Sequence, residues 1–341
     1  MVTRLGMESR RAAPSDEAAK TSAGGLPMPR QAGRARGASR DRRRSRLYWF
    51  DVKASPYAYI APFFLLFLGF GIFPVVFTAW VSLHDWPMLG GGHPFLGLGN
   101  YRELLADENF HKALFNTLSI GVLSTVPQLL LALLVAHLIN ARLRLGTLFQ
   151  IGLVLPNITS VAAVAVIFSQ LFARDFGLIN WVLGQLGVGT IDWQAGTASS
   201  HVALSVMITW RWAGYNALLY LAAMQAVPRE LYEAATIDGA SAFRQLRSIT
   251  VPMIRPTIIF TVIVSTVGAM QIIAEPMLFS GDGLPTGGAD RQFQTLALYL
   301  YEQGFNRLEL GYASAVAWVM FVLVVIAAGV NYLFVRRIRD V

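Results

Sequence analysis

The sequence contains no cysteine, which excludes disulfide bonds, thiolate metal sites and cysteine nucleophiles. Charge is also scarce, because Asp, Glu, Lys and Arg make up 14% of the 341 residues, where a soluble domain carries about 25%. The five histidines lie far apart and form no pair at metal-ligand spacing. A surface with so few charges is mostly not in contact with water, so we expect a membrane protein without metal-binding or catalytic residues.

Lysine is also rare, and this bears on whether the chain can bind ATP. The chain has three lysines, Lys20, Lys53 and Lys112, and none of them follows a glycine. A phosphate-binding P-loop ends in Gly-Lys-Ser/Thr. The chain therefore has no such ATP site, and no cofactor is expected on it. We do not expect it to be an enzyme.

Long apolar runs are what the sequence has instead, with hydrophobic residues at 55%. About 20 apolar residues are needed to cross a bilayer as a helix. Six segments of this kind predict an all-α polytopic membrane protein with six transmembrane helices. They lie at about 57–83, 114–139, 148–172, 201–226, 256–279 and 312–335.

The positions of Arg and Lys give the expected orientation. With the N-terminus inside, the internal segments carry nine basic residues against five in the external loops, even when the N-terminal tail is left out. This agrees with the excess of Lys and Arg in cytoplasmic loops. Both termini are therefore expected in the cytoplasm, with the protein in the cell (plasma or inner) membrane and in contact with its lipid.

The N-terminal residues 1–56 differ from the rest of the chain. They hold 13 of the 28 Lys and Arg residues together with Gly, Ser, Ala and Pro, a composition that cannot bury a core. We expect a disordered basic cytoplasmic tail near anionic lipid rather than a nucleic-acid-binding arm. The transmembrane domain is then expected over residues 57–341.

The segment 227–255 between the fourth and fifth spans is too charged to cross a membrane and too rich in helix formers to be a linker. Pro228 can begin a helix, Gly239 suits the left-handed position that closes one, and Ser241 can cap the next. These features predict two short helices that meet at a glycine elbow in the cytoplasm. The apolar side of such an elbow needs a protein partner.

This segment resembles the EAA signature of ABC importer permeases, through Glu233-Ala234-Ala235, Asp238-Gly239-Ala240 and Ile249 to Pro252. Other stretches resemble the carbohydrate-uptake branch of that family, which includes maltose-type and glycerol-phosphate-type permeases. These stretches are Gly214 to Asn216, Leu219 to Gln225, Gly177 to Asn180 and Gly311 to Ala315, and the similarity runs from about Tyr57 to the C-terminus. The segment Thr286 to Asp290 departs from the family. Related sugar permeases tend to have Gly-Gly-Pro here, whereas Gly287 and Gly288 of this chain are followed by Ala289.

The resemblance implies a permease subunit of an ATP-driven, binding-protein-dependent sugar importer, with a di- or oligosaccharide as the preferred substrate. It also implies partners: a second, similar permease, two copies of an ATP-binding subunit that hold ATP and Mg, and an extracytoplasmic sugar-binding protein. Carried onto this chain, it assigns the coupling to the ATPase to residues of the elbow. They are Glu233, Ala234, Ala235, Asp238, Gly239, Ala240 and Pro252.

Polar groups within the spans are the candidates for the substrate path, because a polar group that faces lipid is costly. Each of them could instead hydrogen-bond between helices. The alternative function is a secondary transporter driven by an ion gradient, which normally needs intramembrane carboxylates, and only Glu275 offers one. The path candidates are Asn157, Tyr215, Asn216, Gln225, Gln271 and Glu275.

Overall fold

The computed structural model describes residue 48 and residues 55–140, 146–281 and 283–339. The chain divides into two units, residues 1–69 and 70–341, and each is described by itself. Almost all of the predicted basic tail, 1–56, lies outside the described residues. The described part is helical, with isolated β-bridges and no strand, which agrees with the predicted all-α class.

The described part of the first unit is α2 (Ser55–Leu66) and the beginning of the π-helix η1 (Phe67–Ile72). Helix α2 contains Pro62 and no buried residue. The helical run Ser55–Val81 carries no charged side chain, and its 27 residues are long and apolar enough to cross a bilayer.

Three helices of the described chain are long and apolar enough to be membrane spans, namely Ser55–Val81, Glu108–Asn140 and Leu310–Leu333. Two bent helix pairs raise the number to five if each pair is one span. The predicted fourth span lies in α9 (Thr197–Gln225), which is long enough but is not among these candidates. Polar side chains such as His201, Arg211 and Asn216 lower its apolarity.

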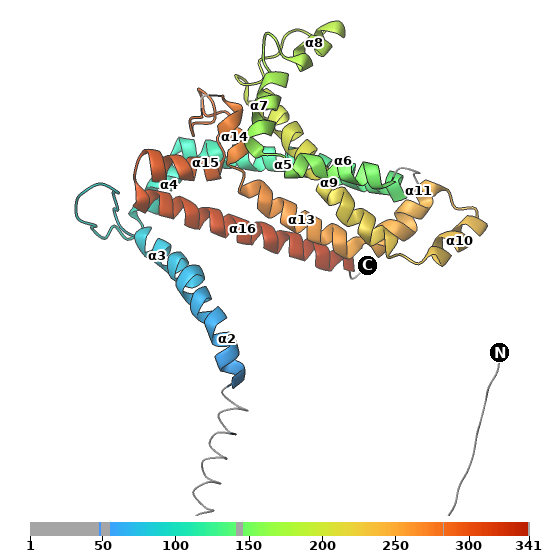
Figure 1. Cartoon of the computed structure of the whole chain (residues 1–341). Coiled ribbons are helices and arrows are strands. Elements are labelled where there is room, and N and C mark those ends of the chain that lie inside the picture. The colour runs from blue at the N-terminus through green and yellow to red at the C-terminus, as the bar shows by residue number, and fades with distance from the viewer. Residues whose placement is uncertain (1–47, 49–54, 141–145, 282, 340–341) are drawn as a thin grey trace, which may run out of the picture. The chain divides into compact units, whose positions relative to one another are not determined.

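The second unit is built around α9, which packs along α5 (Glu108–Asn140). Small residues, Ala132, Ala136 and Ala217, are buried at this contact and allow the two backbones to approach. Helix α13 (Arg255–Met270) packs on both α5 and α16 (Leu310–Arg339), so that these four helices form the bundle (Figure 1). The Tyr220 hydroxyl, 2.6 Å from Thr261 Oγ1, joins α9 to α13.

The predicted third span, 148–172, is not one straight helix. It consists of α6 (Gly146–Ile158) and α7 (Val161–Leu171), which are bent by 96°. Pro156 lies in the last turn of α6, where a proline removes a hydrogen bond and clashes with the preceding turn, and so weakens the helix close to the bend. Helix α6 then lies so close to α9 that a Cβ on Gly214 would be 1.9 Å from the Leu153 carbonyl oxygen.

The predicted fifth span, 256–279, is also interrupted. Helix α13 ends at Met270, and the chain turns before the short helix α14 (Ala274–Phe279). On its other side, α13 is bent by 73° from the helical run Ala242–Met253 that precedes it. The interruption places α14 against α7 and α9 rather than in line with α13.

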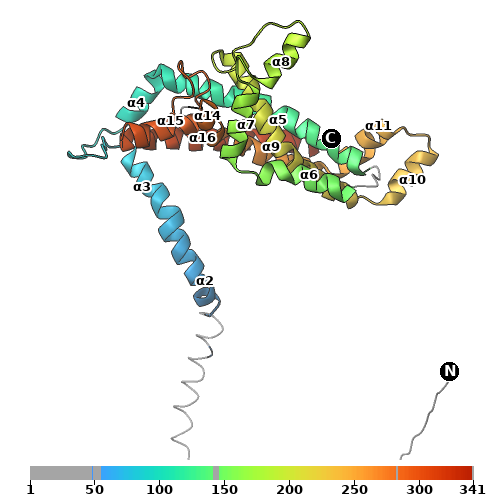
Figure 2. The ribbon, with the colours of Figure 1, turned by 45° about the horizontal axis from the view of Figure 1, so that its top comes forward.

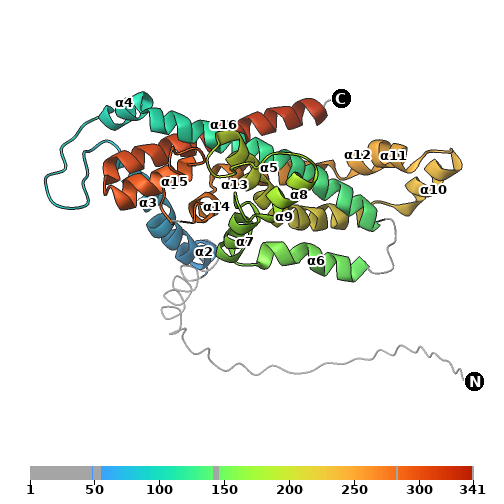
Figure 3. The same cartoon turned by 90° about the horizontal axis from the view of Figure 1, so that it is seen from above.

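The two ends of the second unit differ in their chain segments, as Figures 1, 2 and 3 all show. At the elbow end, α10 (Arg229–Ile237) and α11 (Ala242–Gln245) lie beyond the ends of α6 and α9. At the other end, which we call the α15 end, lie α4 (Gly99–Ala106), α15 (Leu296–Tyr301) and the π-helix η3 (Glu302–Asn306). Helix α8 (Leu178–Gln185) follows α7.

A dense polar network closes the α15 end. Arg291 has a φ of 55°, a left-handed backbone that is uncommon outside glycine, and its guanidinium donates to both carboxylate oxygens of Glu302 at 2.5 and 2.8 Å. Burial raises the pKa of Glu302, but the hydrogen bonds from Arg291 and Gln294 outweigh this and lower it. Asp107 Oδ2 accepts hydrogen bonds from Tyr299 and Tyr312. The two bonds to Asp107 join positions that are 192 and 205 residues apart in sequence.

Candidate functional site

The elbow has the backbone geometry that the sequence predicts. The amide of Gly239 donates to the carbonyl of Thr236 at 3.1 Å, and the amide of Ala240 donates to the carbonyl of Ala235 at 2.9 Å. With Gly239 at a φ of +74°, these two bonds form the Schellman motif that closes a helix. The predicted role of Gly239 as a left-handed helix stop is confirmed.

The second half of the elbow begins at Ser241, as predicted. Its side chain accepts a hydrogen bond from the Arg244 amide at 3.4 Å and caps α11. Gln245 Nε2 donates to Thr236 Oγ1 and to the Ala240 carbonyl, both at 3.1 Å. The hydroxyls of Tyr232 and Thr250 lie 2.9 Å apart. These contacts hold α10 and α11 in one fixed relation.

The elbow also exposes apolar side chains. Ile237 is 87% exposed and Phe243 is 72% exposed, and Leu231 on α10 is exposed as well. Among the predicted coupling residues, Glu233, Ala234, Asp238, Gly239 and Pro252 are exposed, while Ala235 and Ala240 are half-buried. A rigid surface that presents these groups together is suited to contact with another protein.

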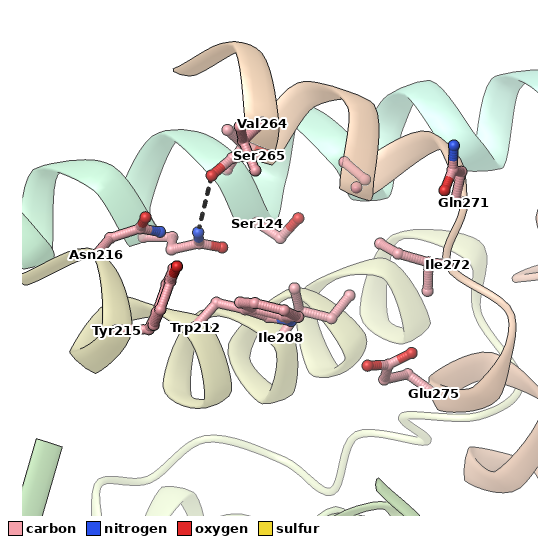
Figure 4. Close-up of a pocket in the computed structure, with 14 residues that line it drawn as sticks. Ser124, Ile208, Trp212, Tyr215, Asn216, Val264, Ser265, Gln271, Ile272 and Glu275 are labelled. Atoms are coloured by element: carbon pink, nitrogen blue, oxygen red, sulfur yellow. Dashed lines mark hydrogen bonds between the residues drawn. The ribbon is translucent and has the colours of Figure 1, made fainter. Parts of the chain in front are cut away.

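A cavity of about 240 Å³ lies between α5, α9, α13 and α14 (Figure 4). It contains four of the six predicted path residues, which are Tyr215 and Asn216 on α9, Gln271 in the break after α13, and Glu275 on α14. The other two are elsewhere, because Asn157 is half-buried near the end of α6 and Gln225 is exposed at the end of α9. The remaining lining residues are Ser124, Thr125, Gln128, Ile208, Trp212, Val264, Ser265, Gly268, Ala269 and Ile272.

The polar wall of the cavity includes groups that sequence reasoning missed. Gln128 Nε2 donates to Ser265 Oγ at 3.3 Å and joins α5 to α13. Ser124 and Trp212 also line the cavity. A polar residue every four positions, Ser124 then Gln128, was the available signal on α5, since positions four apart share a helix face.

An ion pair joins two of the helices around the cavity. Arg211 Nη1 on α9 lies 2.8 Å from Glu275 Oε1 on α14, and the two side chains are 14% and 10% exposed. The Arg211 guanidinium also lies 5.8 Å from the centre of the Trp212 ring. Both residues lie within predicted spans, but they are 64 positions apart in sequence. The break after Met270 brings them together, and the sequence did not predict it.

The structure shows no group of three or more His, Asp or Glu side chains that could hold a metal within its described residues. The site is therefore a cavity lined by apolar and several polar side chains, connected by α9 to an exposed two-helix elbow.

Residues 117–340 match the family model described as "Binding-protein-dependent transport system inner membrane component". This chain belongs to that family. The permease assignment made from the EAA-like segment is thus confirmed, and the chain is a membrane transport component rather than an enzyme.

Curated members of the family are similar along most of their length. The chain is 32% identical over 287 residues to an arabinooligosaccharide transport system permease of Halalkalibacterium halodurans, covering 83% of this chain and 89% of the relative. It is 33% identical to a lactose transport system permease of Rhizobium radiobacter, with coverage of 85% and 96%. It is 32% identical to a trehalose/maltose transport system permease of Thermococcus litoralis, with coverage of 86% and 97%.

The fold is also that of a solved transporter. A crystal structure of a bacterial ABC transporter involved in the import of the acidic polysaccharide alginate has a TM-score of 0.73 with this chain at 22% identity, covering 86% of this chain and 99% of that one. A second crystal structure of the alginate transporter, in complex with an alginate pentasaccharide-bound periplasmic protein, has a TM-score of 0.72. At this identity the likeness concerns the fold alone.

Proposed function

We propose that this permease imports sugars, with a di- or oligosaccharide as substrate, as part of an ATP-driven importer. The observation that carries the proposal is that relatives similar over more than four fifths of the chain are permeases of arabinooligosaccharide, lactose and trehalose/maltose transport systems. The cavity supports it, because amide, hydroxyl and carboxylate groups lie beside Trp212 and Tyr215. Polar groups and aromatic faces are suited to a sugar, which has hydroxyls and an apolar ring face.

The proposal includes six spans and cytoplasmic termini. Helix α9 is the span that apolarity alone does not indicate, and it packs against α5, α6 and α13, with His201 and Asn216 among its buried residues. A helix face buried against protein can carry polar side chains that a lipid-facing one cannot. The basic residues near the elbow, Arg229, Arg244, Arg247 and Arg255, favour the cytoplasmic side for it. The basic tail 1–56 acts in the proposal as a further topology signal.

The elbow is the proposed docking surface for a separate ATPase that binds ATP and Mg. Ala234 and Ala235 permit close approach of a partner, Gly239 with Ala240 closes the first helix, and Pro252 bounds the segment. Glu233 and Asp238 offer exposed carboxylates to basic groups of that partner. Two ATPase copies, a second permease and an extracytoplasmic binding protein complete the proposed importer. The alginate transporter crystallised with a periplasmic protein is a precedent for the last of these.

An uptake experiment tests the energy source. The chain is reconstituted in proteoliposomes with its partner permease, ATPase and binding protein, and uptake of a labelled sugar is measured. We expect uptake to require enclosed ATP and the ATPase, and to survive collapse of the proton gradient at fixed ATP. Uptake that follows the proton gradient and ignores ATP would instead support the ion-gradient alternative.

A further inference from the structure

The cavity is poor in positive charge. Of its fourteen lining residues, one carries a carboxylate, Glu275, and none is Lys, Arg or His. In Figure 4 the Glu275 carboxylate points into the cavity from α14, opposite Tyr215 and Asn216 on α9. A molecule in this cavity therefore meets an anionic oxygen and several neutral hydrogen-bonding groups, but no cation on this wall.

The cation that balances Glu275 lies behind the wall. Arg211 does not line the cavity, and its guanidinium approaches the ring of Trp212, which does. Arg211 engages only one carboxylate oxygen, Oε1. The other oxygen, Oε2, has no hydrogen bond to any described residue and can accept one from a ligand. Arg211 thus fixes the direction of the carboxylate without blocking it.

An ion pair at this depth has a cost that requires a reason. Removing two charges from water is expensive, and an apolar pair of similar size is often as stable or more so. Intramembrane charges in transport proteins commonly mark the path of a substrate. A carboxylate that faces a cavity, with a counter-charge that does not line it, is arranged to receive hydrogen-bond donors.

Sugar hydroxyls are such donors, and a hydrogen bond to a charged acceptor is stronger than one between neutral groups. The carboxylate, phosphate or sulfonate of an anionic sugar has no proton to donate to Glu275 and finds no positive group among the lining residues. The distinction matters within the family, since the relatives include permeases for both neutral sugars and sn-glycerol-3-phosphate.

We propose that Glu275, held in place by Arg211, is a hydroxyl acceptor in the translocation cavity, and that this pair restricts the permease to uncharged sugars. Glu275 is the specificity-determining residue and Arg211 is its positioning residue. The proposal rests on the proposed sugar-import function and adds to it a class of substrate, neutral rather than anionic.

The first experiment uses the complete importer in proteoliposomes with labelled lactose, maltose and arabinotriose beside digalacturonate, an anionic disaccharide. We expect ATP-dependent uptake of at least one neutral sugar and none of digalacturonate. Transport of digalacturonate without any neutral sugar would overturn the charge inference and leave the sugar-import function standing. Uptake of none of the four by an ATP-hydrolysing complex would instead refute the sugar-import function itself.

The second experiment uses variants and the neutral sugar found in the first. Glu275→Gln is expected to lower uptake by about tenfold or more, which corresponds to the loss of one hydrogen bond to a charged acceptor. The double variant Arg211→Gln/Glu275→Gln has no unpaired charge, so it separates the role of the carboxylate from damage caused by a buried arginine. It is expected to assemble normally and still transport poorly, with a raised KM for transport.

The double variant also decides whether the ion pair acts in transport or only in holding the two helices together. Wild-type uptake by Arg211→Gln/Glu275→Gln would show that the pair only holds α9 to α14, and would overturn the proposal. Arg174→Gln is the matched control, because Arg174 forms an exposed ion pair with Asp192 at 3.4 Å away from the cavity. This control is expected to transport like the wild type. Assembly of each variant with the partner subunits is checked by size-exclusion chromatography.

Discussion

The two ends of the second unit hold themselves together in different ways. At the α15 end, charged and polar side chains satisfy one another within the chain, as Arg291 and Glu302 do. At the elbow end, hydrogen bonds fix the backbone, but apolar side chains such as Ile237 and Phe243 remain exposed. Apolar side chains such as Phe305 are exposed at the α15 end as well, so the ends differ in their charged groups: those of the α15 end are paired within this chain, whereas the elbow presents the exposed carboxylates of Glu233 and Asp238 beside its apolar side chains.

The largest expected effect is at the elbow. Gly239→Val places a β-branched residue at a φ of +74°, where a left-handed backbone costs roughly 1–2 kcal/mol, and adds bulk to the proposed docking surface. We expect uptake to fall to background while the protein still inserts in the membrane. Sugar uptake and membrane-fraction immunoblotting measure the two results.

Gly239→Asn is the matched control, because asparagine tolerates the left-handed conformation. It should retain most of the uptake. Normal uptake by Gly239→Val would contradict the importance of the elbow geometry.

A smaller effect is expected at the α15 end, and on a different property. Glu302→Gln removes the partner of Arg291, whose side chain is 19% exposed. After allowance for this exposure, the free energy of unfolding should decrease by about 2 kcal/mol. Association with the ATPase should not change. Thermal unfolding in detergent and copurification of the ATPase measure the two properties.

The pH dependence of stability also tests the contribution of the Arg291–Glu302 pair. Because the pKa of Glu302 is lowered in the folded protein, its contribution is fully present above the unfolded pKa and is lost as the pH falls through the folded pKa. Acidification should therefore destabilise the wild type more than Glu302→Gln. Arg307→Gln is the control, since Arg307 is 47% exposed and 3.4 Å from Glu302, and an exposed pair contributes little. Equal acid sensitivity of wild type and Glu302→Gln would contradict the prediction.

The smallest effect concerns one exposed side chain. Ile237→Ser is expected to weaken association with the ATPase by roughly tenfold, because burial of an isoleucine at an interface contributes at least about 1.5 kcal/mol. Its unfolding temperature should match the wild type, since Ile237 is 87% exposed in this chain. Affinity is measured with the purified ATPase by surface plasmon resonance.

Tyr220→Phe provides the opposite case, since it removes a buried hydrogen bond to Thr261. It should lower stability and leave ATPase affinity unchanged. If Ile237→Ser lowered stability while its ATPase affinity remained normal, the contrast between the two ends would fail.

The elbow was predictable because its determinants are local. Gly239 stops one helix and Ser241 begins the next, and the bonds that they make reach only a few residues along the chain. Backbone chirality and capping act over this range whatever surrounds them.

The cavity was only partly predictable because three distant segments form it. Polarity alone identified Tyr215, Asn216, Gln271 and Glu275, but it also selected Asn157 and Gln225, which lie elsewhere. Which polar group faces the cavity depends on two breaks in the helices. Pro156 lies close to the first break but does not give its 96° angle, and neither break was predicted.

Helix α9 links the two parts of the molecule that these experiments address. It bears Tyr215 at the cavity, runs unbroken to Gln225, and reaches α10 after only three further residues. From Tyr215 to Gln225 the helix rises about 15 Å, so a tilt of roughly 4° at the elbow would displace the cavity wall by about 1 Å. A displacement of the elbow would therefore change the hydrogen-bond distances at the sugar-facing wall of the cavity.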